Sequence, residues 1–132
     1  MCIRDRARLE PLGFEGCCLG TRFVAAADSN AHPAYKAAIV RSQARDTEIA
    51  EVFEIGWPRR RHRVTGLSAE LRERRLPSSP IATTSIYGGR QPIFRYSAAV
   101  PTSETSGAVE QMALYCGTSC EAVAGRTPAV AR

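Results

Sequence analysis

The chain has 132 residues, a formal net charge of +5 and a hydrophobic share of 44%. This apolar share is typical of a globular protein and excludes a wholly disordered chain. No apolar run reaches about 18 residues, so the sequence predicts no transmembrane helix. Lys36 is the only lysine among the 18 basic residues. The modest positive charge is compatible with an ordinary surface and also with an anion-binding one.

The five cysteines favour reduced thiols over a disulfide framework. Their number is odd, and the arginine-rich N-terminal sequence lacks the apolar segment of a secretory signal. We therefore expect a cytoplasmic protein with free thiols. Cys116 and Cys120 are four residues apart and would share one face of a helix. No histidine or acidic cluster with metal-ligand spacing accompanies them, so no metal site is expected.

The first predicted element is a strand that ends at Gly20. Residues 1–6 resemble translated adapter sequence, and residues 1–11 are expected to be a non-native or disordered N-terminus. Residues 16–20 form a short apolar run bounded by glycines. Such a run predicts a buried strand of the kind found in parallel sheets.

A helix is expected to begin near Ala31 and to continue toward residue 44. Asn30 or Ser29 can cap its N-terminus by accepting a hydrogen bond from a backbone N–H. Pro33 falls in the first turn, where its missing N–H costs nothing. Residues 16–44 therefore predict the order strand, loop, helix.

The rest of the chain predicts further short elements. Residues 47–55 alternate loosely and indicate a short strand or an extended arm. Ser68 is placed to start a second helix, with acidic residues first and arginines last, as the helix dipole favours. Residues 77–101 are rich in Pro, Gly, Ser and Thr and predict mostly loop. Residues 106–115 predict a helix, and residues 119–124 a second, shorter one.

The pair Gly20 and Thr21 is the best candidate for an anion site. Glycine lets a backbone approach a phosphate closely, and Thr21 adds a hydroxyl donor. Successive N–H groups in such a turn can point toward one anion. In TIM barrels a cofactor phosphate often sits at the loops after the last two strands. Taken alone, Gly-Thr after a strand is equally typical of an ordinary turn.

Several blocks of the sequence, taken in order, resemble one enzyme family. They are GCCLGTRFV at 16–24, NAHPAYK at 30–36, WPRRRHRV at 57–64, YSAAVP at 96–101 and EQMALY at 110–115. The blocks are similar to the C-terminal part of the nitronate monooxygenases, also called 2-nitropropane dioxygenases. They cover most of residues 12–130 and follow the order of that family.

The resemblance implies a fold, a cofactor and a reaction. Residues 12–132 would be the C-terminal segment of an FMN-binding (β/α)8 TIM barrel, an incomplete α/β unit with the last strand and helix plus a C-terminal extension. The family oxidises alkyl nitronates with dioxygen. Gly20 and Thr21 would contact the FMN phosphate, and residues 96–101 would approach the substrate side of the flavin. The partners implied are a small nitronate and dioxygen, with no nucleic acid and no membrane.

The resemblance assigns no catalytic residue to this chain. The family's catalytic histidine and its first flavin-binding strands have no counterpart here, so the chain alone is expected to be an inactive fragment. His32 precedes Pro33 and is expected to cap or pack, and His62 lies in an arginine run and is expected to be solvated. The alternative function is a small basic module that binds nucleic acid or another anion through residues 59–75. That range lacks the interleaved aromatic residues of nucleic-acid-binding modules.

Overall fold

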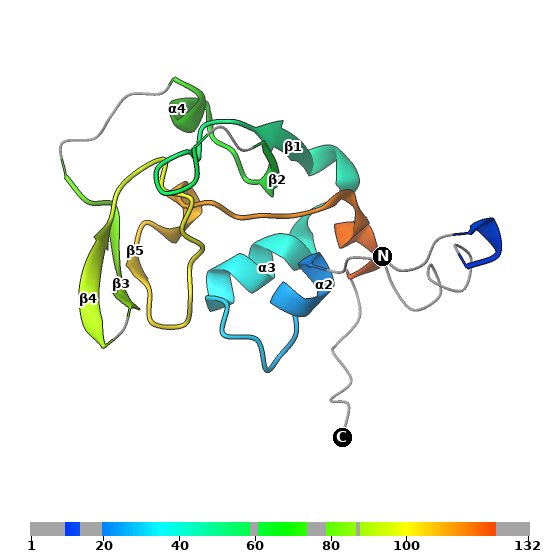
Figure 1. Ribbon diagram of the computed structural model, residues 1–132, viewed down its shortest axis with the longest axis horizontal. Helices are drawn as coiled ribbons and strands as arrows, with labels where there is room; N and C mark the ends of the chain where they lie inside the picture. The colour runs from blue at the N-terminus through cyan, green and yellow to red at the C-terminus, as the bar shows by residue number, and fades with distance from the viewer. Residues whose placement is uncertain (1–9, 14–19, 59–60, 74–78, 87, 124–132) are drawn as a thin grey trace.

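The computed structural model describes residues 10–13, 20–58, 61–73, 79–86 and 88–123 (Figure 1). Within these residues the chain forms short helices and two small antiparallel sheets. The first helical element is a 3-10 turn at Glu10–Leu12, and a four-residue helix α2 follows at Thr21–Val24.

The prediction of a TIM-barrel segment is wrong. Strand β1 (Thr47–Ala50) pairs antiparallel with β2 (His62–Thr65). Strand β3 (Ala82–Ile86) pairs antiparallel with β4 (Gly89–Ile93) and with β5 (Ser106–Gly107). A (β/α)8 barrel needs parallel strands, each followed by a helix. No two strands of the described ranges pair in parallel.

The strand predicted before Gly20 lies almost wholly outside the described residues. Gly20 itself is not in a strand, because it is the residue that precedes α2. The Gly-Thr pair therefore begins a helical turn. One isolated parallel bridge, between Ile55 and Ser97, is the nearest approach to parallel pairing in the part of the chain that is described.

Helix α3 (Pro33–Arg41) is the longest regular element among the described residues. His32 is its N-cap, since the Nδ1 atom of His32 accepts a hydrogen bond from the Ala34 N–H at 3.1 Å. The prediction that His32 caps or packs is confirmed, whereas the prediction of Asn30 or Ser29 as the cap is wrong. Pro33 occupies the first helical position, where its fixed backbone angle suits the helix.

Two further helical predictions are confirmed in outline. Helix α4 (Ala69–Arg72) begins after Ser68, whose Oγ accepts a hydrogen bond from the Leu71 N–H at 3.3 Å. The segment Thr118–Ala122 forms a 3-10 helix near the predicted helix at 119–124. Both elements are short, so tertiary packing rather than helix propensity must hold them.

The predicted loop at 77–101 contains a β-hairpin. Ala82 and Thr84 are buried while Thr83 and Ser85 are only half-buried, which is the period-two pattern of a strand. The pattern is hard to recognise in the sequence because the inward residues are small or polar. Pro92 is tolerated because β4 is an edge strand in the order β4-β3-β5.

The helix predicted at 106–115 is also absent. Strand β5 and a 3-10 turn at Val109–Gln111 come first, and an extended segment over residues 112–117 follows. This segment runs between α3 and the β1–β2 pair (Figure 1). The Thr65 N–H donates to the Leu114 carbonyl at 3.0 Å. The Cys116 N–H donates to the Arg63 carbonyl at 2.9 Å. Residues 114–116 therefore lie along the open edge of β2, which they join through an isolated antiparallel bridge between Val64 and Tyr115.

Three apolar clusters make up the described core. The first packs α3 against the C-terminal residues, the second lies beneath β1, β2 and α4, and the third lies beneath the β3–β4 hairpin. The extended segment supplies residues to all three: Leu114 and Cys116 to the first, Ala113 to the second and Met112 to the third. The extended segment therefore contributes to all three clusters and connects them.

Candidate functional site

The predicted phosphate contacts, Gly20 and Thr21, differ in what they offer to a ligand. Gly20 is exposed, and a Cβ atom placed there would meet nothing within 4 Å. Thr21 is buried, and its Oγ1 atom accepts a hydrogen bond from the Gly117 N–H at 2.8 Å. The backbone at Gly20 is thus open to an anion. The Thr21 hydroxyl is held by the C-terminal part of the chain and retains only its own hydrogen for donation.

Four of the five blocks that carry the family resemblance meet around Tyr115. The Tyr35 hydroxyl donates to the Tyr115 carbonyl at 2.6 Å, and the Tyr115 hydroxyl donates to the Ala98 carbonyl at 3.0 Å. The ring of His62 lies between the rings of Trp57 and Tyr115, with centroid distances of 4.6 Å and 4.9 Å. We call these five residues the Tyr115 cluster. One residue or more comes from each of the blocks 30–36, 57–64, 96–101 and 110–115.

Backbone contacts join block 96–101 to block 30–36 and to Ile55, which precedes block 57–64. The His32 N–H donates to the Pro101 carbonyl at 3.0 Å. Ile55 exchanges hydrogen bonds with the neighbourhood of Tyr96: its N–H donates to the Tyr96 carbonyl at 3.0 Å, and its carbonyl accepts from the Ala98 N–H at 2.9 Å. Segments that are distant in the sequence therefore have a defined arrangement and share one packed unit.

Two tyrosines and one cysteine of this unit have pKa values raised above their ordinary values. Burial raises the pKa of the Tyr35 phenol, and the nearby Cys116 and Tyr115 raise it further. Burial also raises the pKa of Tyr115. Burial, followed by the proximity of Cys120, raises the pKa of the Cys116 thiol to about 12. At neutral pH these groups are hydrogen-bond donors, and Cys116 is not a thiolate nucleophile.

His62 of the Tyr115 cluster and the nearby Tyr96 each have a buried polar atom without a hydrogen-bond partner among the described residues. The Nε2 atom of His62 and the hydroxyl of Tyr96 are buried and have no hydrogen-bond partner among the described residues. The expectation that His62 is solvated is therefore wrong, because its ring is half-buried between two aromatic rings. Tyr96 also has a backbone φ of 69°, in the left-handed region that non-glycine residues seldom adopt.

The described arginines of the basic range 59–75 are engaged within the chain. Arg61 forms an ion pair with Glu51 at 2.8 Å. Arg63 donates to the Thr47 carbonyl at 2.9 Å. Arg59, Arg60, Arg74 and Arg75 lie outside the described residues. The described part of this range therefore offers no row of free arginines to a nucleic-acid backbone.

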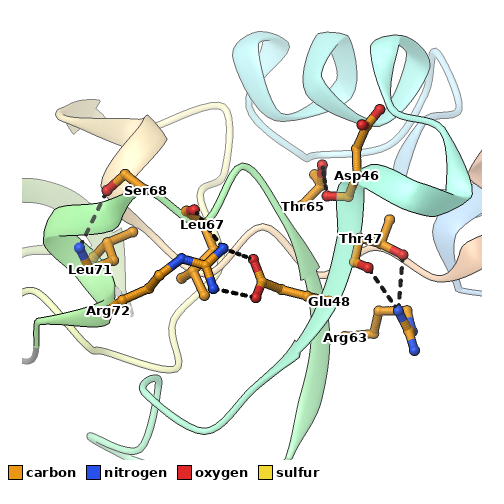
Figure 2. Close-up of polar contacts among 9 residues, drawn as sticks. All are labelled: Asp46, Thr47, Glu48, Arg63, Thr65, Leu67, Ser68, Leu71 and Arg72. Carbon is orange, nitrogen blue, oxygen red and sulfur yellow. Dashed lines mark hydrogen bonds and ion pairs between the residues drawn. The ribbon is translucent and has the colours of Figure 1, made fainter.

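An open groove of about 510 Å³ lies between the end of α3, β1 and α4. On its wall Arg72 forms a two-pronged ion pair with Glu48, and Figure 2 shows the guanidinium facing the carboxylate. We call this the arginine groove, and it is lined by Ala38, Arg41, Ser42, Arg45, Asp46, Glu48, Thr65, Gly66, Leu67 and Arg72. Sequence reasoning missed it, since its arginines come from three separate segments.

Neither a metal cluster nor a membrane-spanning helix is found in the part of the chain that the structure describes. No three His, Cys, Asp or Glu side chains there could hold a metal ion together. No helix there is long and apolar enough to cross a bilayer.

Comparison with known proteins yields no relative. No protein-family model matches the chain, and neither a curated protein nor a solved structure matches it. Functional inference therefore depends on the residues themselves and on their arrangement.

Proposed function

We propose that this chain is part of a cytoplasmic FMN-dependent oxidoreductase that oxidises alkyl nitronates with dioxygen. The observation that carries the proposal is that four of the five resembling blocks contribute residues to the Tyr115 cluster. Tyr35 and Tyr115 are 80 residues apart, and the hydroxyl of the first donates to the carbonyl of the second. The proposal keeps the cofactor and the reaction that the resemblance implies, whereas the barrel that the same resemblance implies is contradicted by the antiparallel sheets.

In this proposal FMN supplies the redox chemistry, and the described residues supply binding. The exposed backbone of Gly20 leaves room for a phosphate, and the Thr21 hydroxyl can donate its own hydrogen while it accepts from Gly117. Neither histidine is assigned the role of catalytic base. His32 uses Nδ1 to cap α3, and the Nε2 atom of His62 is buried away from solvent. Proton abstraction is therefore not assigned to the described residues.

Flavin titration tests the proposal. We expect the protein expressed from its complete gene to bind FMN with quenching of flavin fluorescence and to consume oxygen when a nitronate is added. A protein that neither retains flavin nor consumes oxygen would overturn the proposal. The 132-residue chain titrated in parallel shows how much of the flavin affinity it carries by itself.

Two substitutions test the phosphate contact. Gly20→Val should weaken FMN binding by at least as much as Thr21→Val, because a side chain at residue 20 would obstruct every nearby backbone donor. Loss of one hydrogen bond to a charged group costs roughly 1.5–3 kcal/mol, or about a tenfold to hundredfold loss of affinity. Gly20 has a φ of −113° and free space around it, so Gly20→Val should leave the fold intact.

Thr21→Ser is the matched control, since it keeps the hydroxyl that bonds to Gly117. Its FMN affinity should stay close to that of the unchanged protein, and thermal melts should establish that each variant folds. Unchanged FMN affinity in both Gly20→Val and Thr21→Val would place the phosphate elsewhere.

A further inference from the structure

The arginine groove contains more positive charge than its own carboxylates neutralise. Its lining includes Arg41, Arg45 and Arg72 against Asp46 and Glu48, which is three positive charges and two negative ones. The excess is one positive charge, so the partners of each charged side chain matter more than the sum of the charges.

Arg72 and Glu48 satisfy one another. The two guanidinium nitrogens of Arg72 face the two carboxylate oxygens of Glu48, and Arg72 also donates to the Leu67 carbonyl at 3.4 Å (Figure 2). The remaining carboxylate, Asp46, accepts a hydrogen bond from the Gln43 N–H at 2.9 Å. This bond belongs to the capping box of the 3-10 helix Ala44–Asp46.

Arg41 and Arg45 are the two arginines of the groove whose side chains are not paired within the described residues. Both side chains are exposed, and neither has a hydrogen bond or an ion pair with any described residue. Arg41 is in the last turn of α3, and Arg45 is in the next helical turn. Two like charges that line one groove repel each other, and a bound anion would relieve this repulsion.

The floor of the groove is preorganised. The hydroxyl oxygens of Ser42 and Thr65 are 2.5 Å apart, and Ser42 Oγ donates to the Ala38 carbonyl at 2.8 Å. Both side chains are buried, so the floor keeps its shape when a ligand enters. At the rim Gly66 is exposed with a φ of 70°, and its missing side chain leaves the backbone accessible.

We propose that the arginine groove binds the phosphate group of a small phosphorylated molecule, with Arg41 and Arg45 as its ligands. Guanidinium groups match phosphate oxygens with paired N–H donors, and Arg41 and Arg45 supply two such groups. A volume of about 510 Å³ is in the range of small-molecule sites. The carboxylates of Asp46 and Glu48 beside the arginines oppose an extended polyanion, so a compact phosphate fits better than a nucleic acid.

The probes for the experiment are inorganic phosphate and AMP, at constant ionic strength, with the full 132-residue chain. Two-dimensional NMR should show both probes shifting the amide signals of Thr65, Gly66 and Leu67, and each probe should displace the other. Competition shows that the phosphate is the group recognised, and tighter binding of AMP than of phosphate would show that the groove also contacts the rest of the molecule. Shifts confined to other parts of the chain, or no saturable shifts, would overturn the proposal.

A charge-matched pair of variants separates the groove from general electrostatics. The double variant R41Q/R45Q should weaken phosphate binding by about tenfold to hundredfold, the usual effect of losing charge-assisted hydrogen bonds. The control R61Q/R90Q removes the same charge from exposed arginines outside the groove and should leave the affinity nearly unchanged. Equal losses in both double variants would overturn the proposal.

A conservative variant tests the paired geometry without removing charge. R41K/R45K keeps both positive charges but loses the planar fork of donors, so its phosphate affinity should lie between those of the unchanged chain and R41Q/R45Q. The exposure of Arg41 and Arg45 means that none of these changes removes a buried contact. An affinity in R41K/R45K as low as in R41Q/R45Q would still support guanidinium recognition. Undiminished affinity in both would exclude the two arginines.

Discussion

Around Tyr115 the chain is held by buried, neutral groups, whereas the arginine groove is held by exposed charges. The Tyr35 hydroxyl that bonds to the Tyr115 carbonyl belongs to a side chain that is 1% exposed. In the groove, the side chains of Arg72 and Glu48 are 53% and 36% exposed. Water and salt screen the second kind of contact and barely reach the first. The first region should therefore control stability, and the second should be free to change with a ligand.

The largest expected effect comes from the core that underlies the Tyr115 cluster. Ile39 is 0% exposed and packs with Tyr35 on the buried face of α3. Ile39→Ala should lower the free energy of unfolding by about 2–5 kcal/mol, through lost apolar burial and the cavity left behind. Chemical denaturation monitored by circular dichroism measures the change. Val40→Ala is the control on the same helix: Val40 is 42% exposed, and the variant should be nearly neutral.

High pH should destabilise the Tyr115 region. The folded-state pKa of Cys116 is raised to about 12, and those of Tyr35 and Tyr115 are raised as well. Between about pH 9 and pH 12 the unfolded chain releases the thiol proton that the folded protein retains. The stabilisation is thus complete below pH 9 and is lost as the pH rises through this window.

Thermal melts across this pH range measure the loss. Cys116→Ala removes one of the titrating groups and should make the decline with pH shallower, whatever its effect at neutral pH. A decline of equal slope in the variant would show that Cys116 does not contribute. In the folded protein at neutral pH, alkylation of Cys116 should also be slow, since the thiolate is the reactive form.

Two tyrosine-to-phenylalanine substitutions compare a hydroxyl that donates a hydrogen bond with a hydroxyl that has no partner among the described residues. Tyr35→Phe removes the hydrogen bond to the Tyr115 carbonyl and should cost about 0.5–1.5 kcal/mol. Tyr96→Phe removes a buried hydroxyl that has no partner among the described residues, so it should be neutral or stabilising. Denaturation curves for both variants give the comparison. A larger loss in Tyr96→Phe than in Tyr35→Phe would reveal a partner for the Tyr96 hydroxyl.

The smallest effect is expected at the exposed ion pair of the groove. Arg72→Gln should lower the free energy of unfolding by only about 0.2–1 kcal/mol, and less at high salt. A double-mutant cycle with Glu48→Gln isolates the contribution of the pair. A loss of unfolding free energy as large as that of Ile39→Ala would show that the exposed ion pair stabilises the fold as much as the buried core does.

The sequence by itself determined the elements that depend on local chemistry. Pro33 at a first helical position and Ser68 as a cap predicted the starts of α3 and α4 to within a few residues. The pattern over residues 47–55 indicated a short strand or an extended arm, and β1 forms over its first four residues. Each of these signals acts through hydrogen bonds or backbone angles within a few residues of itself, so no distant partner is needed to interpret it.

Only the tertiary structure decided the rest. Residues 112–115 were expected to be helical, yet they are extended, and the edge of β2 supplies backbone partners at Arg63 and Thr65. The same segment contributes residues to all three apolar clusters. The arginine groove follows the same rule, since Arg72 and Glu48 join Arg41 and Arg45 on its wall only in the folded chain, where β1 pairs with β2. Spacing along a chain carries no information about such contacts, because they form between segments whose separation in space is set by packing.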